Sequence, residues 1–178
     1  MFMNMEEFKN MSVPDIVRHL NVGCGEEITV DFKKIACKLE VSILPRDFSD
    51  FPIPNEKPLC AFVTNEQGNS AFFYDVNLLV CKERSLWRVV LAQAIAKYIV
   101  TGEKSFFVME STEPSGRESQ LMYELLMPED KVHAIIEKLI LPTTLSLGDV
   151  FSVPRSFLIE RLRNLKNKPQ KYIGDYDY

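Results

Sequence analysis

The chain has 178 residues, a formal net charge of −4 at pH 7, 46% hydrophobic residues and 26% charged residues. This length and composition are those of a globular protein with one core-forming domain. The acidic balance argues against a protein whose whole surface binds nucleic acid, although a local basic patch could still do so.

The N-terminus, MFMNMEEFKN, has no basic segment followed by an apolar run, and no apolar stretch approaches the ~20 residues that span a bilayer. We therefore expect no signal peptide, no membrane contact and a cytoplasmic location. The four cysteines contain no CxxC pair, which predicts buried free thiols rather than a disulfide framework. Cys24, between two glycines, is the cysteine expected to be most exposed.

The first half of the chain predicts helices followed by strands. Ser12, an early proline and Asp15 are typical of a helix start, and Asp31 is placed to cap a second helix with one apolar face. The predicted segments are a helix at 12–20, extended residues at 27–30, a helix at 31–40, a strand at 41–44, a proline-rich surface loop at 46–58 and a hairpin of strands 59–64 and 71–76.

The second half predicts a long central helix and then a helical C-terminal part. Gly102 is placed to end the central helix, and Pro128 to end a later one. The predicted segments are a helix at 85–101, a strand at 106–109, helices at 117–127 and 129–141, an irregular segment or short helix at 143–153 and a final helix at 154–166. The fold class is therefore α+β, with a small mixed or antiparallel sheet whose hairpin packs on the central helix.

No catalytic pattern stands out. The chain has no glycine-rich phosphate loop and no GxSxG, and of its two histidines we expect His19 at the surface and His133 on a polar helix. Gln93 and Lys97, in LAQAIAKYIV, are four residues apart, which is the spacing of paired histidines in zinc peptidases. The alternative is an ordinary amphipathic helix with these two residues on its solvated face.

The ordered segments resemble the ImmA/IrrE-type zinc metallopeptidase family, whose members cleave or inactivate repressor proteins of mobile elements and stress responses. DFKKIACKLEVSIL is similar to the family's early helix and edge strand, CAFVTNEQGNSAFFYDVN to its hairpin, and ERSLWRVVLAQAIAKYIVTG to its HExxH helix. RESQLMYELLMPED is similar to the next helix, with LLMP as the most specific element, and SVPRSFLIERLRNL to the closing segment. The resemblance implies a zincin-like domain at residues 31–166, an N-terminal helical extension at 1–30 and a polar tail at 167–178.

In this alignment every chemical position has changed. The two zinc histidines fall on Gln93 and Lys97, the general base on Ala94, and the third ligand on Arg117, with Glu118 one residue away. An amide is a poor zinc ligand, two cations repel zinc, and alanine cannot activate water. The resemblance thus implies a pseudo-peptidase with no metal, no cofactor and no catalytic residue.

Lys97 and Arg117 put two positive charges where the metal would lie, and we expect Glu118 or Glu124 to pair with them across the two helices. The function that follows is that of a non-catalytic regulatory protein of a phage or other bacterial mobile element. It would bind a protein partner, such as a repressor, in the inherited substrate groove. Strand addition beside a sheet edge needs no metal, and the hairpin turn at 65–70 would form a wall.

Two alternatives stay open. One is an active metallopeptidase with rearranged ligands, for example Glu118, His133 and a cysteine. The other is a nucleic-acid-associated regulator that uses a basic C-terminal helix to contact phosphates, although a solvated helix face explains the same residues. The basic positions are Arg155, Arg161, Arg163, Lys166, Lys168 and Lys171.

Overall fold

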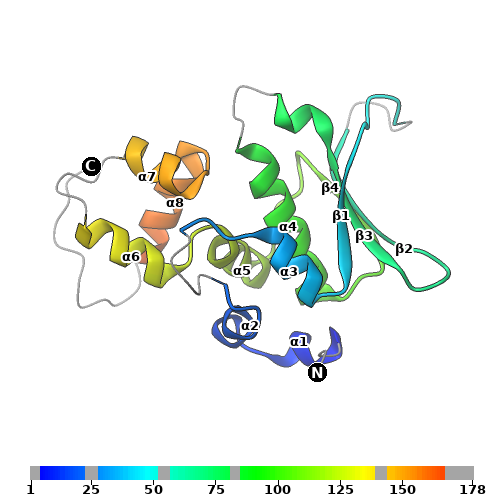
Figure 1. Cartoon of the computed structure of the whole chain (residues 1–178), viewed down its shortest axis with the longest axis horizontal. Helices are drawn as coiled ribbons and strands as arrows, with labels where there is room; N and C mark the ends of the chain where they lie inside the picture. Colours follow the sequence, from blue (N-terminus) through cyan, green and yellow to red (C-terminus); the bar gives the residue numbers. More distant parts are fainter. Residues whose placement is uncertain (1–4, 23–27, 52–56, 81–84, 139–143, 167–178) are drawn as a thin grey trace.

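The computed structural model describes residues 5–22, 28–51, 57–80, 85–138 and 144–166. Within these ranges the chain forms eight α-helices, one 3-10 helix and a single mixed sheet of four strands (Figure 1), which confirms the α+β class. None of the described helices has the length and apolar character needed to cross a bilayer. The predicted polar tail at 167–178 lies outside the described residues.

The sheet has the strand order β1-β3-β2-β4. Its strands are β1 (Val41–Arg46), β2 (Pro58–Thr64), β3 (Ser70–Asp75) and β4 (Ser105–Met109). β1 pairs in parallel with β3, and the other two pairs are antiparallel. The predicted hairpin is confirmed: β2 and β3 are joined by a turn in which Asn69 donates to the Asn65 side chain and Gly68 has a φ of 83°, which favours glycine.

The helix ends agree closely with the sequence signals. The helices are α1 (Met5–Asn10), α2 (Val13–His19), α3 (Phe32–Lys38), η1 (Val76–Leu79), α4 (Leu86–Thr101), α5 (Gly116–Leu126), α6 (Glu129–Lys138), α7 (Thr144–Phe151) and α8 (Arg155–Lys166). Ser12 and Asp31 accept hydrogen bonds from the first turns of α2 and α3, and Gly102 ends α4 in the left-handed conformation. The short helices α1 and η1 were not predicted.

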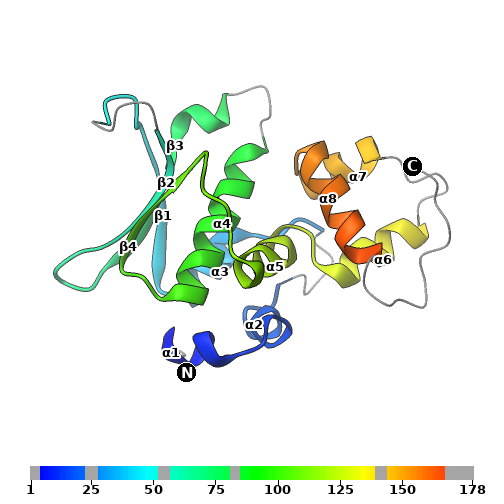
Figure 2. The ribbon, with the colours of Figure 1, turned by 180° about the vertical axis from the view of Figure 1, so that it is seen from behind.

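The elements form layers around α4. α3 and α4 cover one face of the sheet, α5 packs on α4 away from the sheet, and α6, α7 and α8 lie beyond α5 (Figures 1 and 2). On the inner face, the rings of Phe62 and Phe72 pack against Tyr98 of α4, with centroid distances of 4.2 Å and 5.9 Å, and Phe106 stacks on Phe62. Phe8 of α1 and Ile16 of α2 belong to the same core, so the N-terminal helices are part of the packed domain.

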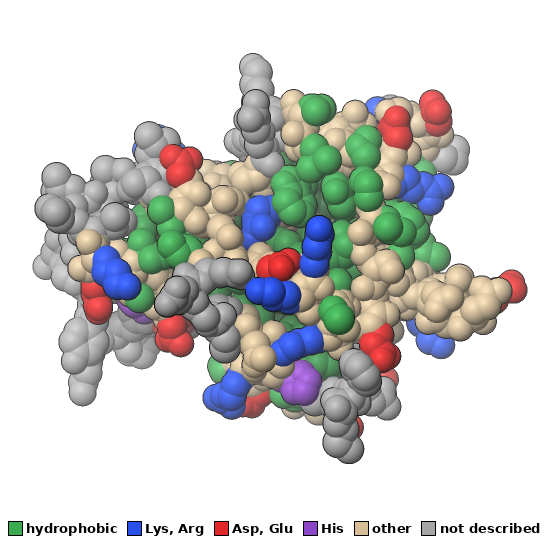
Figure 3. All heavy atoms as spheres, viewed as in Figure 1, with side chains coloured by type: hydrophobic (Ala, Val, Ile, Leu, Met, Phe, Trp, Pro, Cys, Tyr) green, Lys and Arg blue, Asp and Glu red, His purple; other side chains and the backbone are tan. Residues whose placement is uncertain are grey.

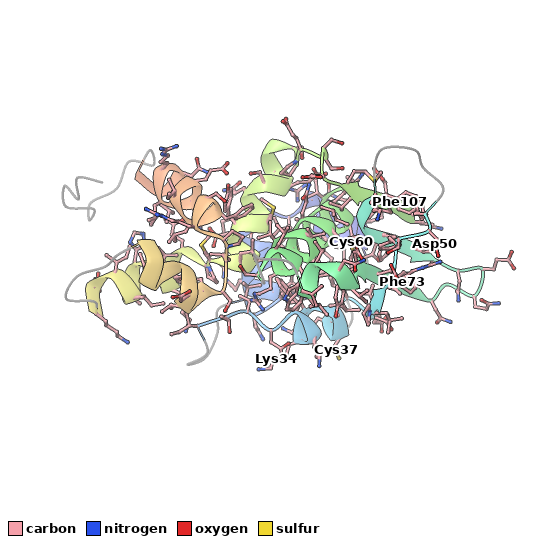
Figure 4. All side chains as sticks on the ribbon, turned by 90° about the horizontal axis from the view of Figure 1, so that it is seen from above. Lys34, Cys37, Asp50, Cys60, Phe73 and Phe107 are labelled. Atoms are coloured by element: carbon pink, nitrogen blue, oxygen red, sulfur yellow. The ribbon has the colours of Figure 1, made fainter. Side chains whose placement is uncertain are left out.

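The outer face of the sheet carries a row of apolar residues. Strand register places Leu44, Phe73, Ala61 and Phe107 side by side across all four strands. Phe51, from the loop after β1, packs on Phe107 with ring centroids 5.2 Å apart. Figure 4 shows Phe73 and Phe107 on this side of the sheet, remote from Lys34 and Cys37, which project from α3.

A second group of apolar side chains is visible over η1 and the start of α4 (Figure 3). Leu79 and Val80 are exposed there, at 42% and 83%. The adjacent rings of Tyr74 and Trp87 lie 5.7 Å apart. The molecule thus exposes apolar surface both on the sheet and beside it.

Candidate functional site

The positions that the predicted resemblance assigns to a metallopeptidase site lie on α4 and α5, which make the largest helix-to-helix interface among the described elements. α4 is buried almost all round, because its alanines and branched residues face the sheet on one side and α5 on the other. α5 begins with a capping box, in which Ser115 accepts from the Glu118 N–H and the Glu118 carboxylate accepts from the Ser115 N–H. α4 and α5 therefore pack directly against each other, and α5 has a capped start.

Gln93 is engaged with the turn that follows β4. Its Nε2 donates to the carbonyl oxygen of Thr112 at 2.8 Å. Thr112 in turn accepts from the Met109 N–H through its hydroxyl at 2.8 Å. Gln93 is half-buried and its side chain links the turn after β4 to α4, which differs from the solvated face of the alternative interpretation.

Lys97 lies one turn further along the same face of α4. Its Nζ is 3.5 Å from the Glu103 carboxylate and 4.8 Å from the centre of the Phe106 ring. Only 24% of the side chain is exposed, so the ammonium is held between an anion and an aromatic face. Ala94, at the general-base position, is completely buried.

Arg117 reaches the N-terminal helix α1 and the residue that follows it. Its guanidinium donates to the backbone carbonyls of Lys9 at 2.6 Å, Phe8 at 3.0 Å and Met11 at 2.6 Å. Carbonyls at the C-terminal end of a helix have no intrahelical partner, so Arg117 satisfies the end of α1. The fork of a guanidinium is suited to this, whereas an ammonium is a point charge.

The predicted ion pairs of Lys97 and Arg117 with Glu118 or Glu124 are therefore wrong. Glu118 serves the capping box, Lys97 pairs with Glu103, and Arg117 binds backbone carbonyls. The error arose because the sequence gives no sign that α1 docks at the start of α5. The four changed positions are each used in packing or hydrogen bonding.

Glu124 pairs instead with Arg161 of α8. Arg161 Nη2 lies 2.5 Å from Glu124 Oε1 and also donates to the Met127 carbonyl at 3.2 Å. Glu124 Oε2 accepts from the Glu129 N–H at 3.1 Å, so this carboxylate joins α5, α6 and α8. Arg161 is only 3% exposed, and its predicted role as a phosphate or partner contact is wrong.

With Arg161 buried, fewer basic residues remain for the predicted nucleic-acid or partner surface. Arg155 and Arg163 are exposed on α8, and Lys166 is the last residue of that helix. Lys168 and Lys171 lie outside the described residues. Arg161 is three residues after Leu158 and four before Leu165, which is the spacing of residues on the buried face of a helix. This pattern could have excluded Arg161 from the predicted basic surface.

The remaining chemistry-bearing side chains are separated. His19 is exposed with its ring 5.4 Å from that of Phe8, and His133 is half-buried on α6. Cys60 is buried, and burial raises the pKa of its thiol to about 12, whereas Cys37 is exposed, contrary to the expectation of buried thiols. Cys24 and Cys81 lie outside the described residues. Among the described residues, no three His, Cys, Asp or Glu side chains are grouped as a metal site would require.

A cavity of about 370 Å³ lies between α2 on one side and α5 with the start of α6 on the other. We call it the α2–α6 groove. Its principal lining residues are Val13, Pro14, Val17, Gln120, Glu124 and Asp130. No local pattern in the sequence indicates this groove, because it forms between helices that are distant in the chain.

The hairpin turn, predicted to form a wall of the substrate groove, does not lie beside Gln93, Lys97 and Arg117. The turn at residues 65–69 extends away from α5, at the far end of the sheet (Figures 1 and 2).

Comparison of the chain with known proteins finds no matching family model, no matching curated protein and no matching solved structure. The likeness to metallopeptidases rests on the ordered segments alone and stays a prediction.

Proposed function

We propose that this protein is a non-catalytic, peptidase-like regulatory protein that acts by binding a protein partner. The observation that carries the proposal is the use of Gln93, Lys97 and Arg117 in structural contacts, with Ala94 buried between them. A hydrolytic site needs ligands and a base free to face water and substrate. Here the corresponding side chains hold a turn, an aromatic ring and a helix end.

Three features support binding as the activity. The outer sheet face and the region beside η1 expose apolar side chains, with Leu44 at 44% and Phe107 at 40%. Exposed apolar patches of this kind mark interaction surfaces. β1 and β4 each have only one strand neighbour within the described sheet, which supports strand addition by an extended partner segment. A cytoplasmic location and a repressor of a mobile element as the partner belong to the same proposal.

The proposal is tested by capture on the full-length chain, with the mass of each captured protein measured over time. We expect an intact protein to be retained with the same yield with and without a metal chelator. If the captured protein is shortened to fragments, and if a metal chelator prevents this shortening, the chain is a working peptidase. The matched variant is Phe107→Ser, which removes one ring of the apolar row and should lower the yield if that face takes part.

A further inference from the structure

The α2–α6 groove has an aliphatic wall because α2 carries more apolar surface than the core uses. Ile16 and Leu20 face the interior and are 0% and 3% exposed. Val17 is half-buried and Pro14 is exposed, and both line the groove. A seven-residue helix with apolar residues beyond its core face leaves a strip on which another aliphatic group can pack.

The charged residues that line the groove are Arg18, Glu124, Glu129, Asp130 and Lys131, and all of them except Asp130 have partners within the chain. Glu124 is bound by Arg161 and by the Glu129 N–H. Arg18, at the edge of α2, is held by Asp15 at 2.8 Å. These pairs fix the walls and leave little charge to attract a ligand.

Asp130 and Gln120 differ from them. Both are exposed lining residues, and neither side chain makes a hydrogen bond or ion pair with any part of the chain that the structure describes. The groove therefore presents a free carboxylate and a free amide opposite Pro14 and Val17. A ligand that binds here needs an aliphatic group to pack on Pro14 and Val17 and a cation or hydrogen-bond donor to meet Asp130 and Gln120.

We propose that the α2–α6 groove binds a short segment of a protein partner in which an aliphatic side chain lies next to a lysine or arginine. This inference rests on the proposed function and names the chemistry of the partner. A cavity of about 370 Å³ is within the range of roughly 300–1,000 Å³ usual for binding pockets. Burial of the aliphatic group supplies the affinity. The Asp130 carboxylate supplies selectivity for a basic neighbour, because opposite charges across an interface favour the right partner more than they add affinity.

The test uses a random peptide library displayed on phage and selected on the immobilised full-length chain. Affinities of the enriched peptides are then measured by fluorescence polarisation. Gln120→Trp places a large side chain at the groove, and Asp130→Lys reverses its free charge. Glu137→Lys makes the same charge change on an exposed part of α6 that does not line the groove.

We expect enriched peptides with Leu, Ile or Val next to Lys or Arg. Their affinity should fall about tenfold in Gln120→Trp and about fivefold in Asp130→Lys, which corresponds to the loss of roughly 1 kcal/mol or more. It should be unchanged in Glu137→Lys. Because Gln120 and Asp130 are exposed, circular dichroism should show the same fold for all three variants.

Three results would overturn the inference. Peptides that bind the Gln120→Trp variant as well as the natural chain would use another surface. An enriched set dominated by acidic residues would contradict the role of Asp130. Selection of no peptide at all would remove the groove as a peptide site. In each case the proposed function is judged separately, by whether the full-length chain retains an intact partner.

Discussion

Arg117 Nη1 lies 2.6 Å from the carbonyl oxygen of Lys9, although the two residues are 108 positions apart in the sequence. This contact, with those to Phe8 and Met11, closes the N-terminal helix over the start of α5. The side chain at the position that the predicted resemblance assigns to a zinc ligand thus holds two distant segments of the fold together.

Removal of the Arg117 guanidinium should loosen α1. Arg117→Ala leaves three carbonyls without their charged donor, and we expect a loss of about 2–3 kcal/mol in the free energy of unfolding. Hydrogen exchange should accelerate in the N-terminal peptide containing residues 5–11. Arg155→Ala, on an exposed part of α8, is the control and should leave both measurements unchanged. Unaltered exchange in Arg117→Ala would show that α1 is held by other contacts.

Substitution of Arg161 should lower the stability of the fold far more than substitution of an exposed basic residue on the same helix. Arg161→Met leaves the Glu124 carboxylate partly buried without its cation, and we expect a cost of about 3–5 kcal/mol. The double variant Arg161→Met with Glu124→Leu should recover part of that loss, because neither charge is then left unpaired. Urea denaturation of both, beside Arg163→Met as an exposed control, measures the difference. Equal stability of Arg161→Met and Arg163→Met would contradict a buried pair.

Cys60 predicts a loss of stability in alkaline solution. Burial raises the pKa of its thiol from 9.0 to about 12 in the folded chain, so the unfolded chain releases the proton first. Unfolding should become easier by about 1.4 kcal/mol per pH unit as pH rises above 9 and until it approaches 12. The slope between pH 9 and pH 10 should be smaller in Cys60→Ala, and a slope identical to that of the natural chain would exclude this thiol as the cause.

The two described thiols should also differ in reactivity. The exposed Cys37 should be alkylated by iodoacetamide under native conditions, whereas Cys60 should react only after unfolding. Peptide mass analysis of the alkylated chain distinguishes the two sites. Rapid native labelling of Cys60 would show that the sheet opens near β2.

Ala94 tests the likeness to a peptidase at the general-base position. Its side chain is completely buried, so Ala94→Glu would place a carboxylate in a packed core, with an expected cost of more than about 3 kcal/mol. Gln120→Glu, on the exposed face of α5, is the control and should be nearly neutral. Thermal unfolding compares the two. A tolerated Ala94→Glu would reveal a cavity in that place and would bring the site closer to a working one.

Much of the fold could be predicted because its signals are local. Ser12, Asp31 and Gly102 mark helix ends by their own hydrogen bonds or conformation, and the hairpin follows from two β-prone runs around a polar turn. The docking of α1 could not be predicted, because Arg117 meets it across more than a hundred residues of sequence separation. The α2–α6 groove was missed for the same reason.

Arg161 shows a different kind of error. Its charge suggested a surface contact, while its place between Leu158 and Leu165 indicated the buried face of α8. Periodicity outweighed charge here, because Glu124 on α5 supplies a carboxylate partner. A charged residue on the apolar face of a helix is therefore a candidate for a buried ion pair before it is a candidate for a surface contact.

Whether the chain holds a metal is decided by its zinc content, measured by plasma mass spectrometry on the purified full-length chain after equilibration with zinc and removal of the free metal. With Gln93, Lys97 and Arg117 engaged in structural contacts, we predict far less than one zinc per chain. One tightly held zinc per chain, lost when Glu118 is changed to Gln, would contradict the account and identify a metallopeptidase with rearranged ligands.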